Sequence, residues 1–251
     1  MFRQIFLSLL FALVVIPAQA AGVLIVGLSA DYPPLHFKQD GKIYGVEPDN
    51  ARAVGKILNM RVELVELPFE ELLPALDAGD IDVIMSGISI TDARLEKMRF
   101  SEPYLKVGQM PILHQSKLGT HSQPWAIYRE GVRVGVEPYT TGARFAEANL
   151  ENAKLKYFDN PDAAFDGLRA DEIDLYLHDA PTSWQLANAP ENGDLISLYT
   201  PLTEEVLAWV VQKDNAALEQ ELNRALELMR ANGSLQYILN RWIPVSIEVA
   251  N

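Results

Sequence analysis

The chain contains the stretch Ile81-Asp-Val-Ile-Met-Ser-Gly-Ile-Ser-Ile-Thr-Asp-Ala-Arg94. It predicts a buried strand at 81–85, a turn of small residues, and a helix that begins near Thr91. Arg94 then lies in the first helical turn, where the helix macrodipole disfavours positive charge. Its guanidinium therefore needs either a neighbouring carboxylate or an anionic ligand. Small residues at Ser86 and Gly87 let a ligand approach the backbone, and a guanidinium beside hydroxyls and free N–H groups suits a carboxylate.

Strand patterns alternate with helix patterns around this stretch. The expected strands lie at residues 23–27, 61–67 and 81–85, and the expected helices lie at 48–58 and 70–78. This order predicts a parallel sheet with crossover helices.

The same alternation restarts after residue 130. Strands are expected at 132–136, 155–158 and 173–177, and helices at 141–150, 162–170, 180–187, 216–230 and 234–242. Two extended apolar runs, at 107–114 and 206–212, bracket the second unit, and a polar loop is expected at 115–123. The two runs predict a two-stranded hinge between lobes, although they also fit two further strands of one large sheet.

We therefore predict an α/β protein of two lobes, each with a mixed, mostly parallel sheet and flanking helices. The first lobe comprises residues 21–110 and 210–251, and the second comprises 111–209. The hinge segments are expected near 107–114 and 205–212.

The N-terminus has the pattern of a secretory signal peptide. Arg3 precedes an apolar run at 5–16, and Ala18-Gln-Ala20 provides a cleavage signal. The run is short for a membrane anchor, and no cysteine for lipidation follows it. We expect residues 1–20 to be removed and the mature protein to be exported, most simply to a bacterial periplasm.

Composition limits the classes of partner. The 251 residues include no cysteine, so an exported chain must rely on its core rather than on disulfides. The formal net charge of −13 becomes −14 when Arg3 is removed. This charge argues against nucleic acid and anionic membranes as partners, and it is compatible with a cationic or zwitterionic ligand.

Further candidate binding residues follow other strands. Thr140 and Thr141, in Glu137-Pro-Tyr-Thr-Thr-Gly142, fit the start of a helix that binds an anion, but ordinary helix capping explains them equally well. Asp179 is either a helix cap or an acceptor for an ammonium group. The aromatic residues Tyr32 and Phe69 fit the walls of a pocket, or simply a core.

Enzyme and metal signatures are missing from the sequence. It contains no Gly-x-Ser-x-Gly, Walker loop or Gly-x-Gly-x-x-Gly, and its four histidines lack metal-ligand spacing. We expect no cofactor and no metal. His36 and His178 fall near the proposed cleft, where each is expected to be a bystander.

Several motifs together resemble the polar amino-acid family of periplasmic solute-binding proteins over nearly the whole mature chain. They are Val26-Gly-Leu-Ser-Ala-Asp-Tyr-Pro-Pro34, Gly45-Val-Glu-Pro-Asp49, the stretch 81–94, Phe100-Ser-Glu-Pro-Tyr104, Thr140-Thr-Gly142, Leu226-Glu-Leu-Met-Arg-Ala-Asn-Gly-Ser-Leu235 and Arg241-Trp242. The resemblance implies the type II periplasmic-binding-protein fold, whose two lobes close over a ligand.

The resemblance also implies roles for individual residues. Arg94 would bind the α-carboxylate of an amino acid, assisted by Ser86, Ser89 and the backbone at Thr140 and Thr141. Asp179 would accept the α-ammonium group, and Tyr32 and Phe69 would flank the side chain. Gly87 and Asp31 complete the expected ligand-binding set. A monomer that hands its ligand to an inner-membrane ABC permease is the expected functional unit.

Three positions depart from the family pattern. Tyr139 stands where glycine is common, so its side chain is expected to enter or narrow the cleft. Ser29 stands where some members that bind basic amino acids carry an acid. This argues against a lysine- or arginine-type ligand unless the neighbouring Asp31 substitutes. Gly87 replaces a serine and removes one hydroxyl donor.

Exported cyclohexadienyl dehydratases share this scaffold and are the enzymatic alternative. The chain is similar to them at Met85-Ser-Gly-Ile-Ser-Ile90, Phe100-Ser-x-Pro-Tyr-Leu105 and Asp31-Tyr32. The glutamate expected three residues after Asp179 is Thr182 here, so we favour a binding protein over an enzyme. Burial and a raised pKa at Asp31 or Glu137 would strengthen the enzymatic alternative. A ligand-sensing receptor subunit is a third interpretation that the sequence leaves open.

Overall fold

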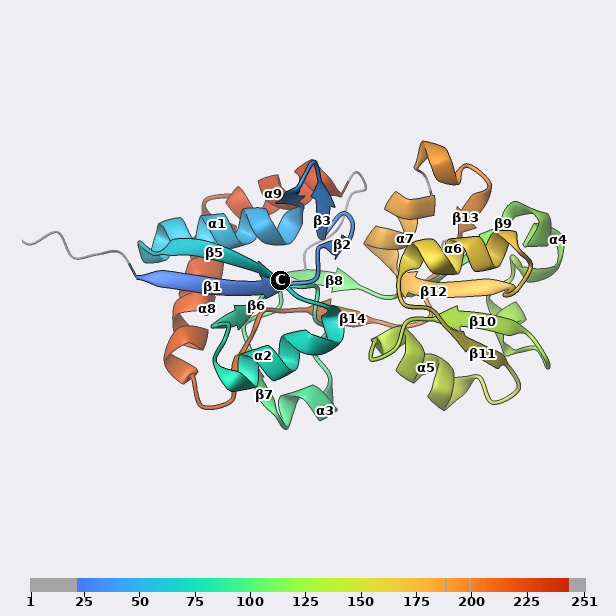
Figure 1. Ribbon diagram of the computed structural model, residues 1–251, viewed down its shortest axis with the longest axis horizontal. Coiled ribbons are helices and arrows are strands. Elements are labelled where there is room, and N and C mark those ends of the chain that lie inside the picture. The colour runs from blue at the N-terminus through green and yellow to red at the C-terminus, as the bar shows by residue number, and fades with distance from the viewer. Residues whose placement is uncertain (1–21, 188, 199, 244–251) are drawn as a thin grey trace, which may run out of the picture.

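Two five-stranded sheets, one in each half of the molecule, form the framework of the computed structural model (Figure 1). The structure describes residues 22–187, 189–198 and 200–243. The signal peptide expected at 1–20 lies outside the described residues. None of the helices in these described ranges has the length and apolarity needed to cross a bilayer.

The sheet of the first half has the strand order β5-β1-β6-β15-β7. Its strands are β1 (Val23–Leu28), β5 (Arg61–Glu66), β6 (Val83–Ile84), β7 (Met98–Phe100) and β15 (Val210–Gln212). Strand β1 runs parallel to β5 and β6, whereas β15 runs antiparallel to β6 and β7. The sheet is therefore mixed, because its last strand returns from the second half.

Helices cover both faces of this sheet. The helices are α1 (Val46–Leu58), α2 (Leu72–Ala78), α3 (Asp92–Leu95), α8 (Ala216–Ala231) and α9 (Ser234–Trp242), with the short 3-10 turn η1 (Phe69–Glu71) before α2. Leu24 and Val26 of β1 pack with α1, α8 and α9, whereas Ile25 packs with α2. Successive side chains of a strand point to opposite faces, so one strand serves two cores.

The sheet of the second half repeats this plan in the order β11-β10-β12-β9-β13. Its strands are β9 (Gln109–His114), β10 (Arg133–Val136), β11 (Lys154–Tyr157), β12 (Leu175–Asp179) and β13 (Leu195–Ser197). Its helices are α4 (Leu118–His121), α5 (Thr141–Asn149), α6 (Pro161–Arg169) and α7 (Ala180–Ala187), with 3-10 turns η2 (Gln115–Lys117), η3 (Pro124–Tyr128) and η4 (Pro190–Asn192). Helix α5 packs on one face and α6 on the other.

A two-stranded antiparallel ribbon lies between the halves and consists of β8 (Leu105–Val107) and β14 (Glu205–Leu207). Each predicted extended run is thus divided between this ribbon and a five-stranded sheet. Trp209, between β14 and β15, is fully buried and stacks on Tyr104 with ring centroids 5.7 Å apart. The ribbon is therefore joined to the core of the first half by aromatic packing.

The predicted strand and helix alternation is confirmed, with two local differences. The strand expected at 173–177 is shifted, because antiparallel pairing of β12 with β9 continues to Asp179, opposite Gln109. The expected loop at 115–123 contains η2 and α4, single helical turns that need no apolar periodicity. A small sheet of β2 (Asp31–Tyr32), β3 (His36–Gln39) and β4 (Lys42–Tyr44) completes the first half.

Candidate ligand-binding site

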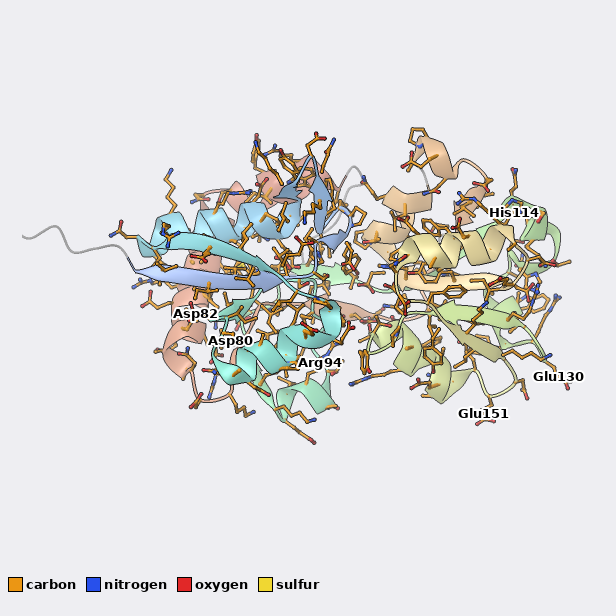
Figure 2. All side chains as sticks on the ribbon, viewed as in Figure 1. Asp80, Asp82, Arg94, His114, Glu130 and Glu151 are labelled. Atoms are coloured by element: carbon orange, nitrogen blue, oxygen red, sulfur yellow. The ribbon has the colours of Figure 1, made fainter. Side chains whose placement is uncertain are left out.

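A cavity of about 190 Å³ lies between the two halves and is lined by residues from both. It lies where parallel strands end: Ser29 follows β1, Glu137 follows β10, and Asp179 ends β12. Ligands of α/β proteins usually bind at the carboxyl ends of such strands. Figure 2 shows Arg94 near the junction of the halves, whereas Asp82 and Glu130 lie toward the outer ends.

Most of the predicted binding residues line this cavity. They are Asp31, Tyr32, Phe69, Gly87, Ser89, Arg94, Thr140, Thr141 and Asp179. Ser86 does not line it: its buried hydroxyl accepts a hydrogen bond from the Ser29 amide and lies 3.1 Å from Nε2 of His36. Ser86 therefore holds the loops of the first half together.

Arg94 reaches the cavity from α3, whose N-cap is Thr91. The side chain is only 6% exposed. Nη1 donates to the carbonyl oxygen of Ser89 at 2.8 Å, and Nη2 donates across the cleft to the carbonyl oxygen of Tyr139 at 3.4 Å. These described hydrogen-bond partners carry no charge. Burial, with the nearby Arg144, lowers the pKa of Arg94 to about 10, so the guanidinium remains cationic at neutral pH.

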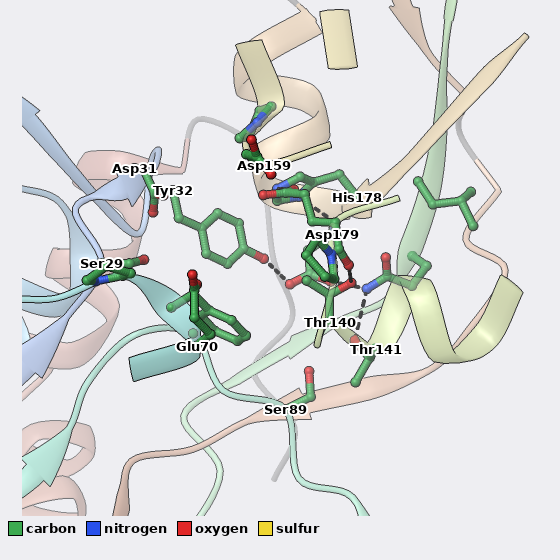
Figure 3. Close-up of a pocket in the computed structure, with 18 of the residues that line it drawn as sticks. Ser29, Asp31, Tyr32, Glu70, Ser89, Thr140, Thr141, Asp159, His178 and Asp179 are labelled. Atoms are coloured by element: carbon green, nitrogen blue, oxygen red, sulfur yellow. Dashed lines mark hydrogen bonds and ion pairs between the residues drawn. The ribbon is translucent and has the colours of Figure 1, made fainter. Parts of the chain in front are cut away.

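Asp179 lies in the second half and is buried. It accepts hydrogen bonds from the hydroxyl of Tyr32, in the first half, and from Nε2 of Gln109 (Figure 3). Burial, followed by repulsion from Glu205, raises the pKa of Asp179 well above its ordinary value. A cation in the cavity would supply the positive charge that this carboxylate lacks.

Gln109 is a lining residue that the sequence analysis missed. It lies directly opposite Asp179 in the β9–β12 register, and its Nε2 also donates to Oγ1 of Thr141 at 3.2 Å. The sequence feature that could have pointed to Gln109 is that it is a polar residue near the start of the largely apolar run at 107–114. The pairing register, which the sequence does not show, is what brings it to the site.

Thr140 serves as an ordinary helix cap. Its hydroxyl oxygen accepts from the amide of Ala143 at 3.1 Å and donates to the carbonyl of Glu137 at 2.7 Å. Tyr139 corrects the expectation that its side chain narrows the cleft, because it is 66% exposed and does not line the cavity. Its φ of 65° lies in the left-handed region that glycine adopts most easily.

Two buried histidines flank Tyr32 edge-on, His36 at 5.4 Å and His178 at 4.8 Å between ring centroids. Burial lowers the pKa of each to about 3, so both are neutral at physiological pH. Of the two, His178 lines the cavity, as does Phe69 from η1.

Glu137 extends the site at the end of β10. Its Oε1 accepts a hydrogen bond from the Tyr176 hydroxyl and lies 3.4 Å from Nε2 of His178. Nδ1 of His178 accepts from the amide of Asp179 at 2.8 Å, so the neutral ring carries its proton on Nε2, facing Glu137. Burial raises the pKa of Glu137 to about 7, the Tyr176 bond opposes that rise, and repulsion from Asp31 adds to it.

This pKa predicts a pH-dependent stability of the ligand-free protein. The folded state holds the Glu137 proton above the ordinary pKa of 4.5, so the contribution of Glu137 to stability is fully present below 4.5 and is lost as the pH rises through about 7. The loss is on the order of 3 kcal/mol in the free energy of unfolding. Urea unfolding at several pH values should show a loss in the wild type that exceeds the loss in Glu137→Gln by this amount. Parallel curves for the two proteins would contradict the prediction.

Comparisons with known proteins agree on one family. The family model for bacterial extracellular solute-binding proteins, family 3, matches residues 24–245. The L-cystine-binding protein TcyJ of Escherichia coli strain K12 is 27% identical over 90% of this chain and 84% of its own length. A probable histidine-binding protein of Neisseria gonorrhoeae is 30% identical over 86% of this chain and 81% of its own.

A solved structure is similar over a comparable length. The ancestral amino acid-binding protein AncCDT-1, a precursor of cyclohexadienyl dehydratase, superposes with a TM-score of 0.81 and 30% identity. The match covers 88% of this chain and 95% of that one. The two-lobed α/β fold expected from the sequence is therefore confirmed.

Proposed function

Because the chain belongs to the bacterial extracellular solute-binding proteins of family 3, we propose that it is an exported amino-acid receptor. It binds one free amino acid between its halves and delivers it to an ABC permease of the inner membrane. The names of its relatives as cystine- and histidine-binding proteins support an amino-acid ligand. They also favour binding over the dehydratase alternative.

The observation that carries this proposal is the buried Arg94 guanidinium, whose described hydrogen-bond partners are backbone carbonyls. Burying a charge is expensive unless it is paired, so the site is built for an anionic group. A planar guanidinium suits a carboxylate through two parallel hydrogen bonds. Arg94 is therefore assigned the α-carboxylate of the ligand, and the hydroxyl-bearing residues Ser89 and Thr141 line the same cavity.

Asp179 is assigned the α-ammonium group at the other end of the zwitterion. Arg94 belongs to the first half and Asp179 to the second, so one ligand contacts both halves. Binding then favours the closed arrangement, with the β8–β14 ribbon as the hinge. Tyr32 of the first half already donates a hydrogen bond to Asp179, so a ligand ammonium group would share this acceptor with it.

The dehydratase alternative receives no support from the residue at its expected general-acid position. Thr182 is fully buried and does not line the cavity. Its hydroxyl has no hydrogen-bond partner within the described part of the chain. A threonine hydroxyl does not titrate near neutral pH, so it cannot replace a glutamic acid. Glu137 is half-buried with a raised pKa, but it lines the ligand cavity with its carboxylate held by Tyr176, which also suits a binding role.

A thermal-shift screen of the mature protein against the standard amino acids and prephenate tests the proposal. One or a few amino acids at about a hundred times their Kd should raise the melting temperature by about 5–10 °C. No shift with any amino acid would contradict the proposal. A shift with prephenate alone would favour the dehydratase instead.

A further inference from the structure

The cavity is strongly acidic. Five carboxylate side chains line it, those of Asp31, Glu70, Glu137, Asp159 and Asp179. Arg94 is the one arginine or lysine among the described lining residues. The proposed function uses Arg94 and Asp179 for the two charges common to every free amino acid. Of the other four, Asp31, Glu70 and Asp159 are exposed, whereas Glu137 is half-buried. A ligand with an uncharged side chain would leave the half-buried Glu137 carboxylate without a counter-charge.

Two of these four carboxylates belong to opposite halves of the molecule. Asp31 comes from β2 of the first half, and Glu137 follows β10 of the second. Asp31 is close enough for its charge to raise the pKa values of both Glu137 and Tyr176. Closing the halves without a cation between them therefore brings two carboxylates together at an energetic cost.

The surroundings of Glu137 leave it able to accept a positive charge. Tyr176 and His178, both neutral, contact Oε1, whereas the described residues provide no hydrogen-bond donor to Oε2. The groups that face Glu137 are thus Tyr176 and His178 from β12 and Asp31 from the first half. They orient the carboxylate without neutralising it.

We propose that Glu137 is the specificity-determining residue of this site and that, with Asp31, it binds the cationic end of a basic amino-acid side chain. The proposal rests on the proposed function and names its substrate class. Ser29 itself carries no acid, but Asp31, two positions along the chain, lines the same cavity and supplies the carboxylate there. The positive side chain joins the two halves at a second point, away from Arg94.

The test compares L-arginine with L-citrulline, which has nearly the same shape and no side-chain charge. Isothermal titration at pH 8 keeps Glu137 ionised in the complex. In the wild type, arginine should bind at least about tenfold more tightly than citrulline. In Glu137→Gln this ratio should fall toward one, because arginine affinity drops while citrulline affinity changes by less than about threefold. Lysine and glutamine form a second charged and uncharged pair.

Two controls keep the test decisive. Glu130→Gln makes the same substitution at an exposed position far from the cavity and should leave the ratio unchanged (Figure 2). Asp31 contacts the same cation from the other half, so Asp31→Asn should also reduce the ratio of arginine to citrulline affinity. This variant keeps the proposal testable if Glu137→Gln fails to fold. Three results would overturn the inference. They are equal binding of citrulline and arginine by the wild type, binding restricted to neutral or acidic amino acids, and an affinity ratio that neither substitution changes. Each of those results is compatible with the proposed amino-acid receptor, whereas the absence of any amino-acid binding would contradict the proposed function itself.

Discussion

Arg94→Ala is expected to weaken ligand binding by roughly 2–5 kcal/mol, or about 30-fold to several thousand-fold in Kd. The ligand carboxylate would then be buried without its counter-charge. The ligand-free protein should melt at nearly the same temperature, because the hydrogen bonds of Arg94 go to two backbone carbonyls and no ion pair is broken. Titration calorimetry with the ligand identified by the screen measures the first effect, and thermal unfolding measures the second.

Two matched variants sharpen this experiment. Arg94→Lys keeps the charge but removes the planar fork, so its affinity should lie between those of the wild type and the alanine variant. Arg224→Ala removes an exposed arginine that pairs with Glu221 and should bind like the wild type. Unchanged affinity in Arg94→Ala would remove the central support of the binding proposal.

Glu47→Ala is expected to lower the free energy of unfolding by about 3–5 kcal/mol. The Glu47 carboxylate is fully buried in the first half. It accepts hydrogen bonds from the Gly87 amide at 3.0 Å, the Tyr104 hydroxyl at 2.6 Å and Nε1 of Trp209 at 3.1 Å. Removing it leaves three buried donors without an acceptor. Urea unfolding followed by circular dichroism measures the loss.

Glu47→Gln is the informative comparison, because it keeps one oxygen acceptor and nearly the same shape. We expect it to lose less stability than the alanine variant. Glu130→Ala, at an exposed position, should change stability by less than about 0.5 kcal/mol. A loss below 1 kcal/mol in Glu47→Ala would show that these donors find other partners, and would sink the prediction.

Local patterns in the sequence were sufficient for much of the fold. The period-two and helical spacings identified the repeated strand and helix units, because each element buries one face in its own half. Arg94 was recognisable as a candidate because a cation in a first helical turn conflicts with the helix dipole. That reasoning needs only neighbouring residues, and the structure places the side chain in the cavity.

Contacts between residues far apart in the sequence were not available from such patterns. Tyr32 and Asp179 are 147 positions apart, and Ser89 meets Glu205 from 116 positions away. Gln109 reaches the cavity through a strand register that no local pattern encodes. Glu137 was considered only for the enzymatic alternative and not as a ligand-binding residue, because its environment is made by Tyr176 and His178 on another strand. The roles assigned to these residues stay predictions until the substitutions are measured.

The buried Trp209 and Tyr104 make the two halves mechanically unequal. Both crossings of the chain are embedded in the first half: Leu105 is 2% exposed and Leu207 is fully buried. Gly108 comes next, and a Cβ there would clash with the carbonyl oxygen of Thr203, so the two crossings are also in close contact just beyond the ribbon. Because Tyr104 and Trp209 are packed into the core of the first half, we expect any rotation between the halves to occur about the chain beyond these two residues. We therefore expect the ribbon to stay fixed to the first half, which carries Arg94, while the second half, which carries Asp179 and Glu137, rotates relative to it.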